Sequence, residues 1–302
     1  MPRAEVLLAA DAVAGETLLD GVDAVIAGVR VTPAYARAKR VRWLHLTAAG
    51  IEAQAIPELR DAPFAITHKA RASVNPMADH VMAQILVFSR RVLEVHALQR
   101  ERRWGGHDDT LDQVGDLRGK TLGIVGLGNV GLAIARRARP FGMRVIGTKR
   151  SAVAKLPNVS RVLAPSQLRE VLAEADFVAL TAPLTEETRG LIGEAELRAM
   201  KPTAYLINVS RGQLVREPAL VRALRERWIA GASLDVFEHE PLPPDSPLWE
   251  VAVVTPHYSG AGSTHRREAA DEVARNLRRL ARGQELLYRI NKADVPVAAD
   301  SP

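Results

Sequence analysis

The stretch that decides the fold is TLGIVGLGNVG, residues 121–131. A short apolar run typical of a strand is followed at once by three closely spaced glycines and then by an amphipathic segment over 130–139. Glycines in this pattern allow a tight turn, close approach of the backbone to a pyrophosphate and close packing of helix on strand. The free N–H groups at the helix start then face the phosphates. The pattern predicts dinucleotide binding, against the alternative of a structural glycine turn, by Gly126, Gly128, Asn129, Val130 and Gly131.

Strand-like and helix-like segments alternate after this stretch. Apolar runs typical of strands are found at 121–125, 144–146, 177–180, 204–208, 233–236 and 251–255, with helical patterns such as 130–139 and 218–227 between them. Six strands joined by crossovers predict a doubly wound parallel sheet, a Rossmann cofactor domain.

The first ninety residues carry a second set of strand candidates, at 6–8, 24–27, 43–46 and 64–67. A helix start follows at Asn75-Pro76, and its apolar pattern continues to about Trp104. The segment 264–282 is expected to return the chain to the first domain. We therefore predict an α/β fold of two domains, with the Rossmann domain (95–285) inserted into a smaller flavodoxin-like substrate domain (1–94 and 286–302).

Composition excludes several classes of protein. The chain has 302 residues, 41 Lys plus Arg against 35 Asp plus Glu, and no Cys. Disulfides, thiolate catalysis and Cys-ligated metals are therefore excluded. The apolar run near the N-terminus is too short for a signal-peptide core, and no run is long enough to span a bilayer. No aromatic residues alternate with the cations as a base-stacking surface requires. We expect a soluble cytoplasmic protein that binds neither nucleic acid nor membrane.

The segment after the second strand of the larger domain bears on the choice of cofactor. An acidic residue about 20 positions after the glycines would bind the ribose hydroxyl of NAD, but this chain has Thr148, Lys149, Arg150 and Ser151 there. Two cations and two hydroxyls suit a 2′-phosphate, which a carboxylate would repel. NADP(H) is therefore predicted as the preferred cofactor, with NAD(H) possible. The alternative is a solvated basic loop.

Three more segments with chemical groups follow predicted strands, where open α/β sheets bind their ligands. They read NVSRG (208–212), DVFEHEP (235–241) and TPH (255–257). Together with LRGKTLG (117–123), APLT (182–185) and ETRG (187–190), they resemble the D-isomer-specific 2-hydroxyacid dehydrogenase family, which includes glyoxylate/hydroxypyruvate reductases. The resemblance covers nearly the whole chain and is densest over 117–262.

The resemblance implies that Arg211 binds the substrate, that His257 is the acid-base catalyst and that Glu240 is its carboxylate partner. The chemistry of these residues agrees. Reduction of a 2-keto acid requires a proton at the carbonyl oxygen, and an imidazolium delivers one near neutral pH. A neighbouring carboxylate stabilises the protonated ring and raises its pKa. A forked guanidinium suits a carboxylate and polarises the adjacent carbonyl.

Other residues near these motifs have competing interpretations. The family pattern places Asp235 near the cofactor, where it either tunes the site or caps a loop. Pro183 is also predicted to bind the cofactor. We interpret His239 as a surface histidine, Glu238 as a solvated carboxylate and His80 as a structural hydrogen-bonding residue. The histidines show no metal-ligand spacing, so no catalytic metal is predicted.

The first domain has a segment that matches the family and one that departs from it. Small residues in Thr47-Ala48-Ala49-Gly50 match a loop whose backbone amides hold the substrate carboxylate, the alternative being a plain turn. The segment 67–74, THKARASV, departs from the family's Asn-Ala-x-Gly pattern. Arg71 is predicted to be at the substrate site, where either the pocket accepts a second anionic group or the cleft is altered.

The leading functional hypothesis is an NADP-preferring reductase of small 2-keto acids, with glyoxylate or hydroxypyruvate as substrate and a D-hydroxy acid as product. The resemblance also implies a homodimer organised through the cofactor domain. The alternative is a nucleotide-sensing binding protein, similar to the corepressor relatives of this family. Oxidation of formate or phosphite ranks lower, because formate enzymes of this fold have a glutamine in place of Glu240.

Overall fold

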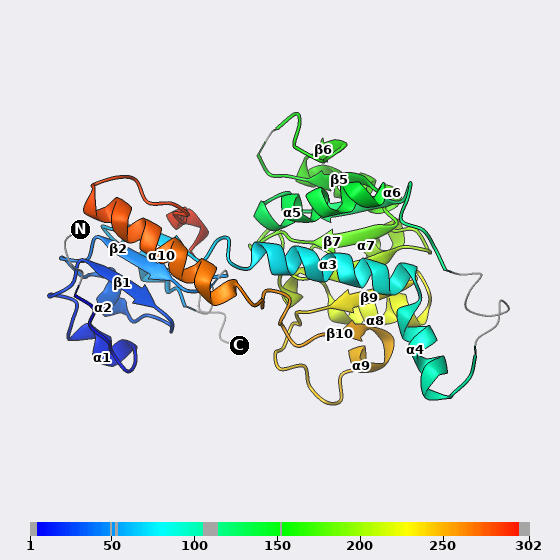
Figure 1. The fold of residues 1–302 in the computed structure, drawn as a ribbon, viewed down its shortest axis with the longest axis horizontal. Coiled ribbons are helices and arrows are strands. Elements are labelled where there is room, and N and C mark those ends of the chain that lie inside the picture. Colours follow the sequence, from blue (N-terminus) through cyan, green and yellow to red (C-terminus); the bar gives the residue numbers. More distant parts are fainter. Residues whose placement is uncertain (1–4, 49, 52–53, 105–113, 152, 296–302) are drawn as a thin grey trace. The chain divides into compact units, whose positions relative to one another are not determined.

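The computed structural model describes residues 5–48, 50–51, 54–104, 114–151 and 153–295. Contacts within the chain divide it into two compact units (Figure 1). The first unit takes in Met1–Ser73 and Gly262–Pro302, and the second is Val74–Ala261. Each unit has a parallel sheet of its own.

The second unit contains a seven-stranded parallel sheet with the order β10-β9-β8-β7-β4-β5-β6. The chain runs outward from β4 through β5 to β6, then returns to the other side of β4 and continues through β7 to β10. This is the doubly wound order, and it reverses between β4 and β7. The strands are β4 (Thr121–Val125), β5 (Arg144–Thr148), β6 (Arg161–Leu163), β7 (Phe177–Leu180), β8 (Tyr205–Asn208), β9 (Gly231–Leu234) and β10 (Val253–Val254).

Two layers of helices cover this sheet because successive strand side chains point to opposite faces. Ile124 packs into the cluster that includes Ile85 and Ile134, whereas Val125 packs into the cluster that includes Leu172 and Leu197. One face is therefore covered by α3 (Val74–Ser89) and α5 (Asn129–Ala138), and the other by α6 (Leu168–Glu174), α7 (Glu194–Ala199) and α8 (Glu217–Arg225). The remaining helical elements here are α4 (Val92–Arg100), α9 (Leu248–Val251), η3 (Arg139–Phe141), η4 (Pro165–Gln167) and η5 (Gly212–Leu214).

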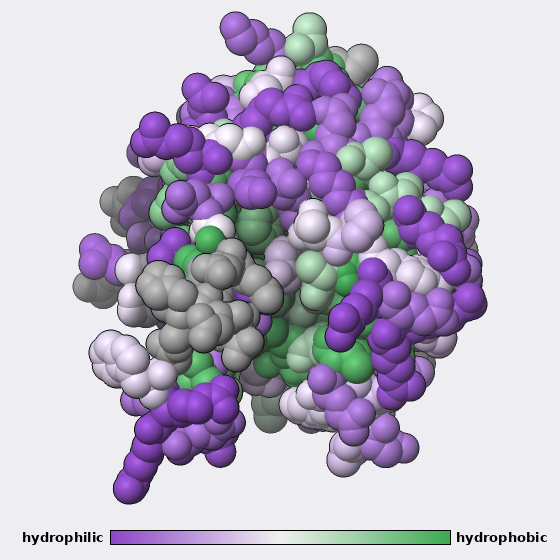
Figure 2. Space-filling model, turned by 90° about the vertical axis from the view of Figure 1, so that its right-hand side faces the viewer, coloured by the Kyte–Doolittle hydropathy of each residue, from purple (hydrophilic) through white to green (hydrophobic). Residues whose placement is uncertain are grey.

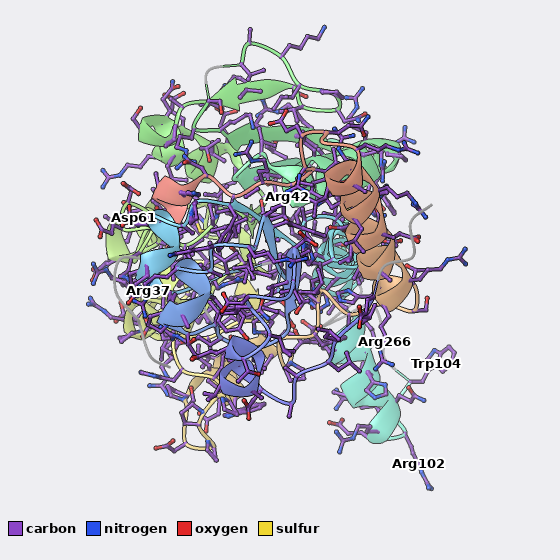
Figure 3. All side chains as sticks on the ribbon, turned by 90° about the vertical axis from the view of Figure 1, so that its left-hand side faces the viewer. Arg37, Arg42, Asp61, Arg102, Trp104 and Arg266 are labelled. Atoms are coloured by element: carbon purple, nitrogen blue, oxygen red, sulfur yellow. The ribbon has the colours of Figure 1, made fainter. Side chains whose placement is uncertain are left out.

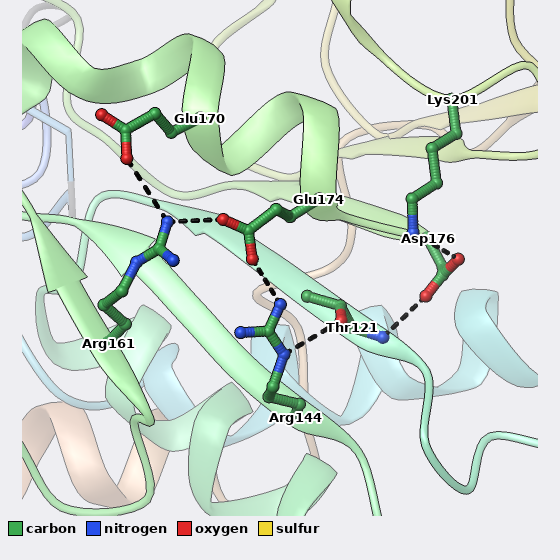
Figure 4. Close-up of polar contacts among 7 residues, drawn as sticks. All are labelled: Thr121, Arg144, Arg161, Glu170, Glu174, Asp176 and Lys201. Atoms are coloured by element: carbon green, nitrogen blue, oxygen red, sulfur yellow. Dashed lines mark hydrogen bonds and ion pairs between the residues drawn. The ribbon is translucent and has the colours of Figure 1, made fainter.

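A network of charged side chains lies at the amino-terminal ends of the strands (Figure 4). Arg144 and Arg161, the first residues of β5 and β6, each place a guanidinium nitrogen 2.5 Å from a carboxylate oxygen of Glu174. Asp176 accepts a hydrogen bond from the backbone N–H of Thr121 at 2.7 Å and contacts Lys201 at 3.0 Å. Exposed ion pairs of this kind contribute about 0.2–1 kcal/mol each. The network therefore links the amino-terminal ends of neighbouring strands, and the residues at the carboxyl-terminal edge of the sheet are different ones.

The first unit contains three parallel strands in sequence order, β1 (Ala24–Ala27), β2 (Trp43–Leu46) and β3 (Ala65–His68). The central strand β2 is buried along its whole length. Its helices are α1 (Ala12–Glu16), α2 (Pro33–Ala36) and α10 (His265–Ala281), with the short η1 (Pro57–Arg60) and η6 (Lys292–Asp294). The buried Asn276 of α10 exchanges two hydrogen bonds with the backbone of Leu287, which fixes the chain after the helix.

The sequence predicted a strand at 6–8, and the structure has none there. Val6 and Leu8 are 76% and 90% exposed, so these apolar side chains find no core to pack against. A run of three apolar residues satisfies a strand pattern, but a strand also needs a paired neighbour. The expected single helix from Asn75 to about Trp104 is also interrupted, because Arg91 has a left-handed φ of 52° between α3 and α4.

The bounds of the two units differ from the expected domain bounds by one helix at each of the two places where the chain passes from one unit to the other. Helix α3 packs on α5 and falls in the second unit, although residues 1–94 were assigned to the substrate domain. Helix α10 falls in the first unit, because its Glu272 and Asn276 bind backbone groups there. None of the described helices is both long and apolar enough to cross a membrane.

The predicted strands of the large sheet are otherwise present, with β9 and β10 placed differently by a few residues. Strand β6 was not predicted, because it has three residues and begins with an arginine. Neither feature produces an apolar run.

Candidate active site and cofactor cradle

The glycine turn after β4 forms a cradle of backbone. Gly126 has a φ of +103°, and a Cβ there would meet the backbone nitrogen of Ala182 at 2.6 Å. A Cβ at Gly131 would meet the carbonyl oxygen of Gly126 at 2.5 Å. Gly128, by contrast, is the exposed N-cap of α5, which has no side-chain capping hydrogen bond, and a Cβ on Gly128 would meet nothing within 4 Å. Free N–H groups at an uncapped helix start fit the pyrophosphate of a dinucleotide.

Two threonines hold this turn from the neighbouring strands. The hydroxyl of Thr148, at the end of β5, accepts the N–H of Gly126 at 3.2 Å, and its carbonyl accepts the N–H of Leu127 at 2.8 Å. The hydroxyl of Thr181, just after β7, donates to the carbonyl of Gly126 at 2.7 Å. Thr148 is buried and supports the turn, and its contact with a cofactor stays a prediction. Thr181 was not predicted, since a single threonine after a strand gives no signal of its own.

The basic segment after β5 lies beside the same turn. Lys149 donates from Nζ to the carbonyl of Leu127 at 3.1 Å, and Arg150 and Ser151 are exposed. Arg150 also acts on Glu187, whose pKa is lowered mainly by the hydrogen bond from Thr185 and in smaller part by the arginine. Pro183 is exposed two residues beyond Thr181, and its carbonyl accepts the hydroxyl of Thr188. Lys149 thus lies against the glycine turn, and Arg150 and Ser151 are the next two residues along the chain.

His257 and Glu240 form a close pair in the same unit. Nδ1 of His257 lies 2.6 Å from Oε2 of Glu240. The other oxygen, Oε1, accepts the backbone N–H of Phe237 at 2.9 Å, which fixes the carboxylate. The imidazole side chain remains 50% exposed. A carboxylate on Nδ1 sets the tautomer and leaves Nε2 to act on a substrate.

The pair shifts both pKa values in the sense that acid catalysis requires. The hydrogen bond that His257 donates to Glu240 raises the pKa of His257, outweighing the opposing effects of burial and of Arg211. Burial alone would raise the pKa of Glu240, but the bonds from His257 and Phe237 and the charge of Arg211 lower it. The charged pair, imidazolium with carboxylate, is therefore favoured near neutral pH.

Arg211 is brought to this pair by the loop after β8. Asn208 shapes the loop, donating from Nδ2 to the carbonyl of Arg211 at 2.9 Å and accepting the N–H of Ser210 at 3.0 Å. The next residue must be glycine, since a Cβ on Gly212 would overlap the carbonyl carbon of Phe237 at 1.8 Å. This close approach joins the arginine loop to the segment that carries Glu240. The structure thus brings together all three predicted catalytic residues.

Asp235 holds the loop that carries His257. Its carboxylate is fully buried and accepts the hydroxyl of Thr255 at 2.6 Å and the N–H groups of Tyr258 and Ser259 at 3.1 and 2.9 Å. Its carbonyl accepts the N–H of His257 at 2.9 Å. His257 has a left-handed φ of 49°, a costly conformation that these bonds maintain. Of the two roles predicted for Asp235, loop capping is the one visible here, and its contact with a cofactor stays a prediction.

The neighbouring polar residues lie as follows. His239 is exposed. Glu238 was expected to be solvated, but it is partly buried and exchanges backbone hydrogen bonds with Glu217, each carboxylate accepting the other's N–H. His80 is buried, with its ring edge-on to Tyr258 at 5.4 Å. Burial lowers its pKa, opposed by Asp235.

Some of the residues predicted to bind substrate in the first unit already donate their backbone N–H groups to other side chains. The N–H of Ala48 donates to the side-chain oxygen of Gln54 at 2.9 Å, so the structure occupies one amide of the expected carboxylate loop. Ala49 lies outside the described residues, and Gly50 is partly exposed. The side chain of Arg71 is exposed, while its N–H donates to Glu272 at 2.9 Å. Gln54 was not predicted, because it lies outside the loop motif, six residues after Ala48, whose N–H it accepts.

Comparison with known proteins places this geometry in a family. A family model described as D-isomer specific 2-hydroxyacid dehydrogenase, NAD binding domain, matches residues 82–259. The glyoxylate reductase of Korarchaeum cryptofilum is 39% identical over 286 residues, covering 93% of this chain and 82% of that protein. The glyoxylate reductase of Thermococcus onnurineus is 40% identical over 248 residues, covering 80% and 73%.

Solved structures agree with these matches. A D-isomer specific 2-hydroxyacid dehydrogenase from Xanthobacter autotrophicus, in complex with NADPH and MES, superposes with a TM-score of 0.80 at 31% identity, covering 91% of this chain and 85% of that one. An NADPH-dependent glyoxylate/hydroxypyruvate reductase from Sinorhizobium meliloti, in complex with NADP and sulfate, has a TM-score of 0.77 at 26% identity and covers 90% and 86%. The family and the α/β fold predicted from the motifs are confirmed: the chain belongs to the D-isomer-specific 2-hydroxyacid dehydrogenase family, and its second unit is the Rossmann NAD-binding domain of that family.

Proposed function

We propose that the protein is an NADPH-preferring reductase of small 2-keto acids, with glyoxylate or hydroxypyruvate as substrate and the corresponding 2-hydroxy acid as product, in the D configuration where that product is chiral. The single observation that carries this proposal is the His257–Glu240 pair, 2.6 Å apart, with the charge of Arg211 acting on both members. The similarity to glyoxylate reductases and to enzymes in complex with NADPH or NADP supports the same choice.

In this proposal the cofactor, when bound on the glycine cradle, supplies a hydride to the carbonyl carbon of the substrate. The protonated His257 gives its Nε2 proton to the carbonyl oxygen, while Glu240 holds Nδ1 and stabilises the positive ring. Arg211 binds the substrate carboxylate and stabilises negative charge developing on the carbonyl oxygen. In the reverse direction the neutral imidazole accepts the hydroxyl proton.

The direct test is the loss of NADPH absorbance in the presence of glyoxylate, hydroxypyruvate or phenylpyruvate. Turnover with at least one of these keto acids is expected. Tight NADPH binding without turnover of any keto acid would instead favour the nucleotide-sensing alternative. The absence of cysteine fits a reducing compartment such as the cytoplasm, which is the setting we propose.

The cofactor preference depends on the basic segment after β5. Replacing Arg150 or Lys149 by glutamine is expected to raise the KM for NADPH by about 10–100-fold, the value of one charge-assisted hydrogen bond to a phosphate. The KM for NADH, which lacks the 2′-phosphate, is expected to change far less. Steady-state kinetics with both cofactors measure the two values.

Lys120→Gln is the matched control for this measurement. Lys120 is exposed and immediately precedes β4, at the opposite edge of the sheet from the glycine turn. Its replacement is expected to leave the ratio of the two KM values unchanged. Unchanged KM values in Arg150→Gln and Lys149→Gln would indicate a solvated loop, and equal losses with NADPH and NADH would show that the segment does not recognise the 2′-phosphate.

We also propose that the protein is a homodimer organised through the second unit. Helix α4 has no buried residue, and it exposes Val92, Leu93 and Val95. Beyond its end, Trp104 is 99% exposed and projects from the ribbon together with Arg102 (Figure 3). The face on which α4 lies shows apolar surface among hydrophilic side chains (Figure 2). Apolar residues clustered in this way are typical of a protein interface.

Sedimentation is expected to give twice the 32.8 kDa mass of one chain. A Leu93→Lys variant is expected to weaken the dimer at least about 10-fold, because it places a charge in the apolar contact. The control is Val29→Lys, which changes an equally exposed valine of the first unit. A monomeric wild-type protein at micromolar concentration would contradict this assembly.

A further inference from the structure

The segment that carries Glu240 is held by side chains that lie outside the His257–Glu240 pair. Its backbone at Phe237 supplies the N–H that fixes Oε1 of Glu240 at 2.9 Å. The next residue, Glu238, is bound at both of its backbone polar groups. Its N–H donates to Oε1 of Glu217 at 2.7 Å, and its carbonyl accepts a hydrogen bond from Nε2 of Gln213 at 3.2 Å. The position of Glu240 therefore depends on the groups that hold the peptide unit between Phe237 and Glu238.

The same peptide unit packs against the backbone of the arginine loop. A Cβ on Gly212 would overlap the carbonyl carbon and oxygen of Phe237 at 1.8 and 2.0 Å, and the nitrogen of Glu238 at 2.4 Å. Packing of this kind stops the peptide from moving closer to Gly212, but it does not stop the peptide from turning away. The carboxylate of Glu217, which binds the peptide N–H, supplies this second restraint.

The bond between Glu217 and Glu238 is reciprocal. Oε1 of Glu238 accepts the backbone N–H of Glu217 at 3.2 Å, so each residue is both donor and acceptor. Glu217 is the first residue of α8, and Leu220 and Ala223 bury that helix in the core of the second unit. The pair thus joins segment 237–240 to a well-packed helix of the same unit.

Glu217 occupies a place that is unfavourable for a carboxylate. Burial raises its pKa, the N–H of Glu238 lowers it, and the negative charges of Glu238 and Glu240 raise it again. A carboxylate at the start of a helix is stabilised by the helix dipole. That effect needs neither burial nor nearness to two other carboxylates. The contact that this placement provides is the acceptor for the N–H of Glu238.

From these contacts we infer that Glu217 is a positioning residue for the proposed reaction: through the N–H of Glu238 it holds the segment that places Glu240 against His257. The inference rests on the proposed function and deepens it, because it concerns the same proton donor. Glu217 itself touches neither the imidazole nor, in this inference, the substrate.

The electrostatic causes of the His257 pKa agree with an indirect role for Glu217. The charges that act on the imidazole are those of Glu240, Arg211 and Asp235. A change at Glu217 is therefore expected to reach His257 through the position of Glu240, and not through the charge of Glu217.

Two variants of Glu217 separate the reach of its side chain from its charge. Glu217→Gln removes the charge and keeps a side-chain oxygen of the same reach, which can still accept the N–H of Glu238. Glu217→Asp keeps the charge and is shorter by one methylene, so its oxygens are withdrawn from that N–H. Each variant keeps a polar side chain at the start of α8, and thermal unfolding checks that it is folded.

The readout is the pH dependence of kcat/KM for keto-acid reduction with NADPH on the full-length enzyme. Reduction needs the imidazolium, so activity falls as pH rises through the raised pKa of His257. In Glu217→Asp the hold on Glu240 is loosened, and the alkaline limb is expected to move to lower pH by about half a pH unit or more. In Glu217→Gln the limb is expected to stay within about 0.2 pH unit of the wild type.

Glu194 is the matched control, because it is the first residue of α7 as Glu217 is of α8. Its carboxylate pairs with Arg198 and Arg222 instead of with the backbone of segment 237–240. Glu194→Gln and Glu194→Asp make the same changes of charge and length at a helix start. Both are expected to keep the alkaline limb of the wild type.

A limb that moves as far in Glu217→Gln as in Glu217→Asp would overturn the inference, because Glu217 would then act by its charge. A limb that moves in neither variant would also overturn it, because the position of Glu240 would not depend on Glu217. Either result would leave the reductase assignment standing.

Absence of turnover with every keto acid would contradict the proposed function instead. NMR titration of the His257 ring, with its signal assigned by comparison with His257→Gln, then measures the same effect without a substrate. A ring pKa that is lower in Glu217→Asp than in Glu217→Gln would support the positioning role. Equal ring pKa values in these two variants would overturn it.

Discussion

Replacing His257 by glutamine is expected to lower kcat for keto-acid reduction by about 10²–10⁴-fold, the usual contribution of a positioned general acid. The variant keeps a polar side chain of similar size but has no proton to give near neutral pH. Glu240, the glycine cradle and Arg211 remain in place, so NADPH affinity is expected to change little. The loss should therefore fall on kcat and not on cofactor binding.

Stopped-flow measurement of NADPH oxidation in a single turnover separates this loss from slow product release. His239→Gln is the control, since His239 is exposed and lies next to Glu240 in the chain. It is expected to retain wild-type kcat. A His257→Gln enzyme within about 3-fold of the wild type would require a different proton donor.

Replacing Arg211 by lysine is expected to lower kcat/KM by about 10²–10³-fold, similar to the loss of a group that stabilises transition-state charge. Lysine keeps the positive charge but lacks the planar fork that binds a carboxylate with two parallel hydrogen bonds. Arg211 acts on substrate and transition state, so KM is expected to rise and kcat to fall together. The charge of Arg211 also lowers the pKa of His257, an effect that lysine retains in part.

Steady-state kinetics with the best keto acid measure both parameters. Arg225→Lys on the exposed face of α8 is the control and is expected to behave as the wild type. A variant whose KM rises while kcat is unchanged would show that Arg211 only binds the substrate. A variant without any loss would remove it from the site.

The sequence predicted those elements that have both a recognisable local pattern, such as an apolar run, and residues that the packing of the fold requires. Strand β4 and the glycine turn combine an apolar run with positions that only glycine can occupy, as at Gly126 and Gly131. Segment 6–8 has the local apolar pattern of a strand, but its side chains are exposed and it pairs with no strand. Strand β6 has no such local pattern, and it is a strand only because it pairs with β5.

The proximity of Arg211, Glu240 and His257 could be predicted, because each of them lies in a motif with a fixed place after a strand. The supporting residues could not, since their partners are far away in the sequence. Glu272 binds the backbone of residues 70–72 from about 200 positions away, and Thr181 binds Gly126 across the strand order reversal. Asp235 carries a signal, but its place in the motif does not distinguish a cofactor contact from the loop contacts that the structure shows.

The pH dependence of kcat/KM for keto-acid reduction, measured on the wild type and on Glu240→Gln, tests most directly whether the His257–Glu240 pair donates the proton. Reduction needs the imidazolium, so activity is present below the raised pKa of His257 and falls as pH rises through it. Glutamine removes the charge that raises this pKa, and the account predicts that the alkaline limb moves to lower pH. Superimposable profiles would contradict it, because the proton would then come from a group that Glu240 does not touch.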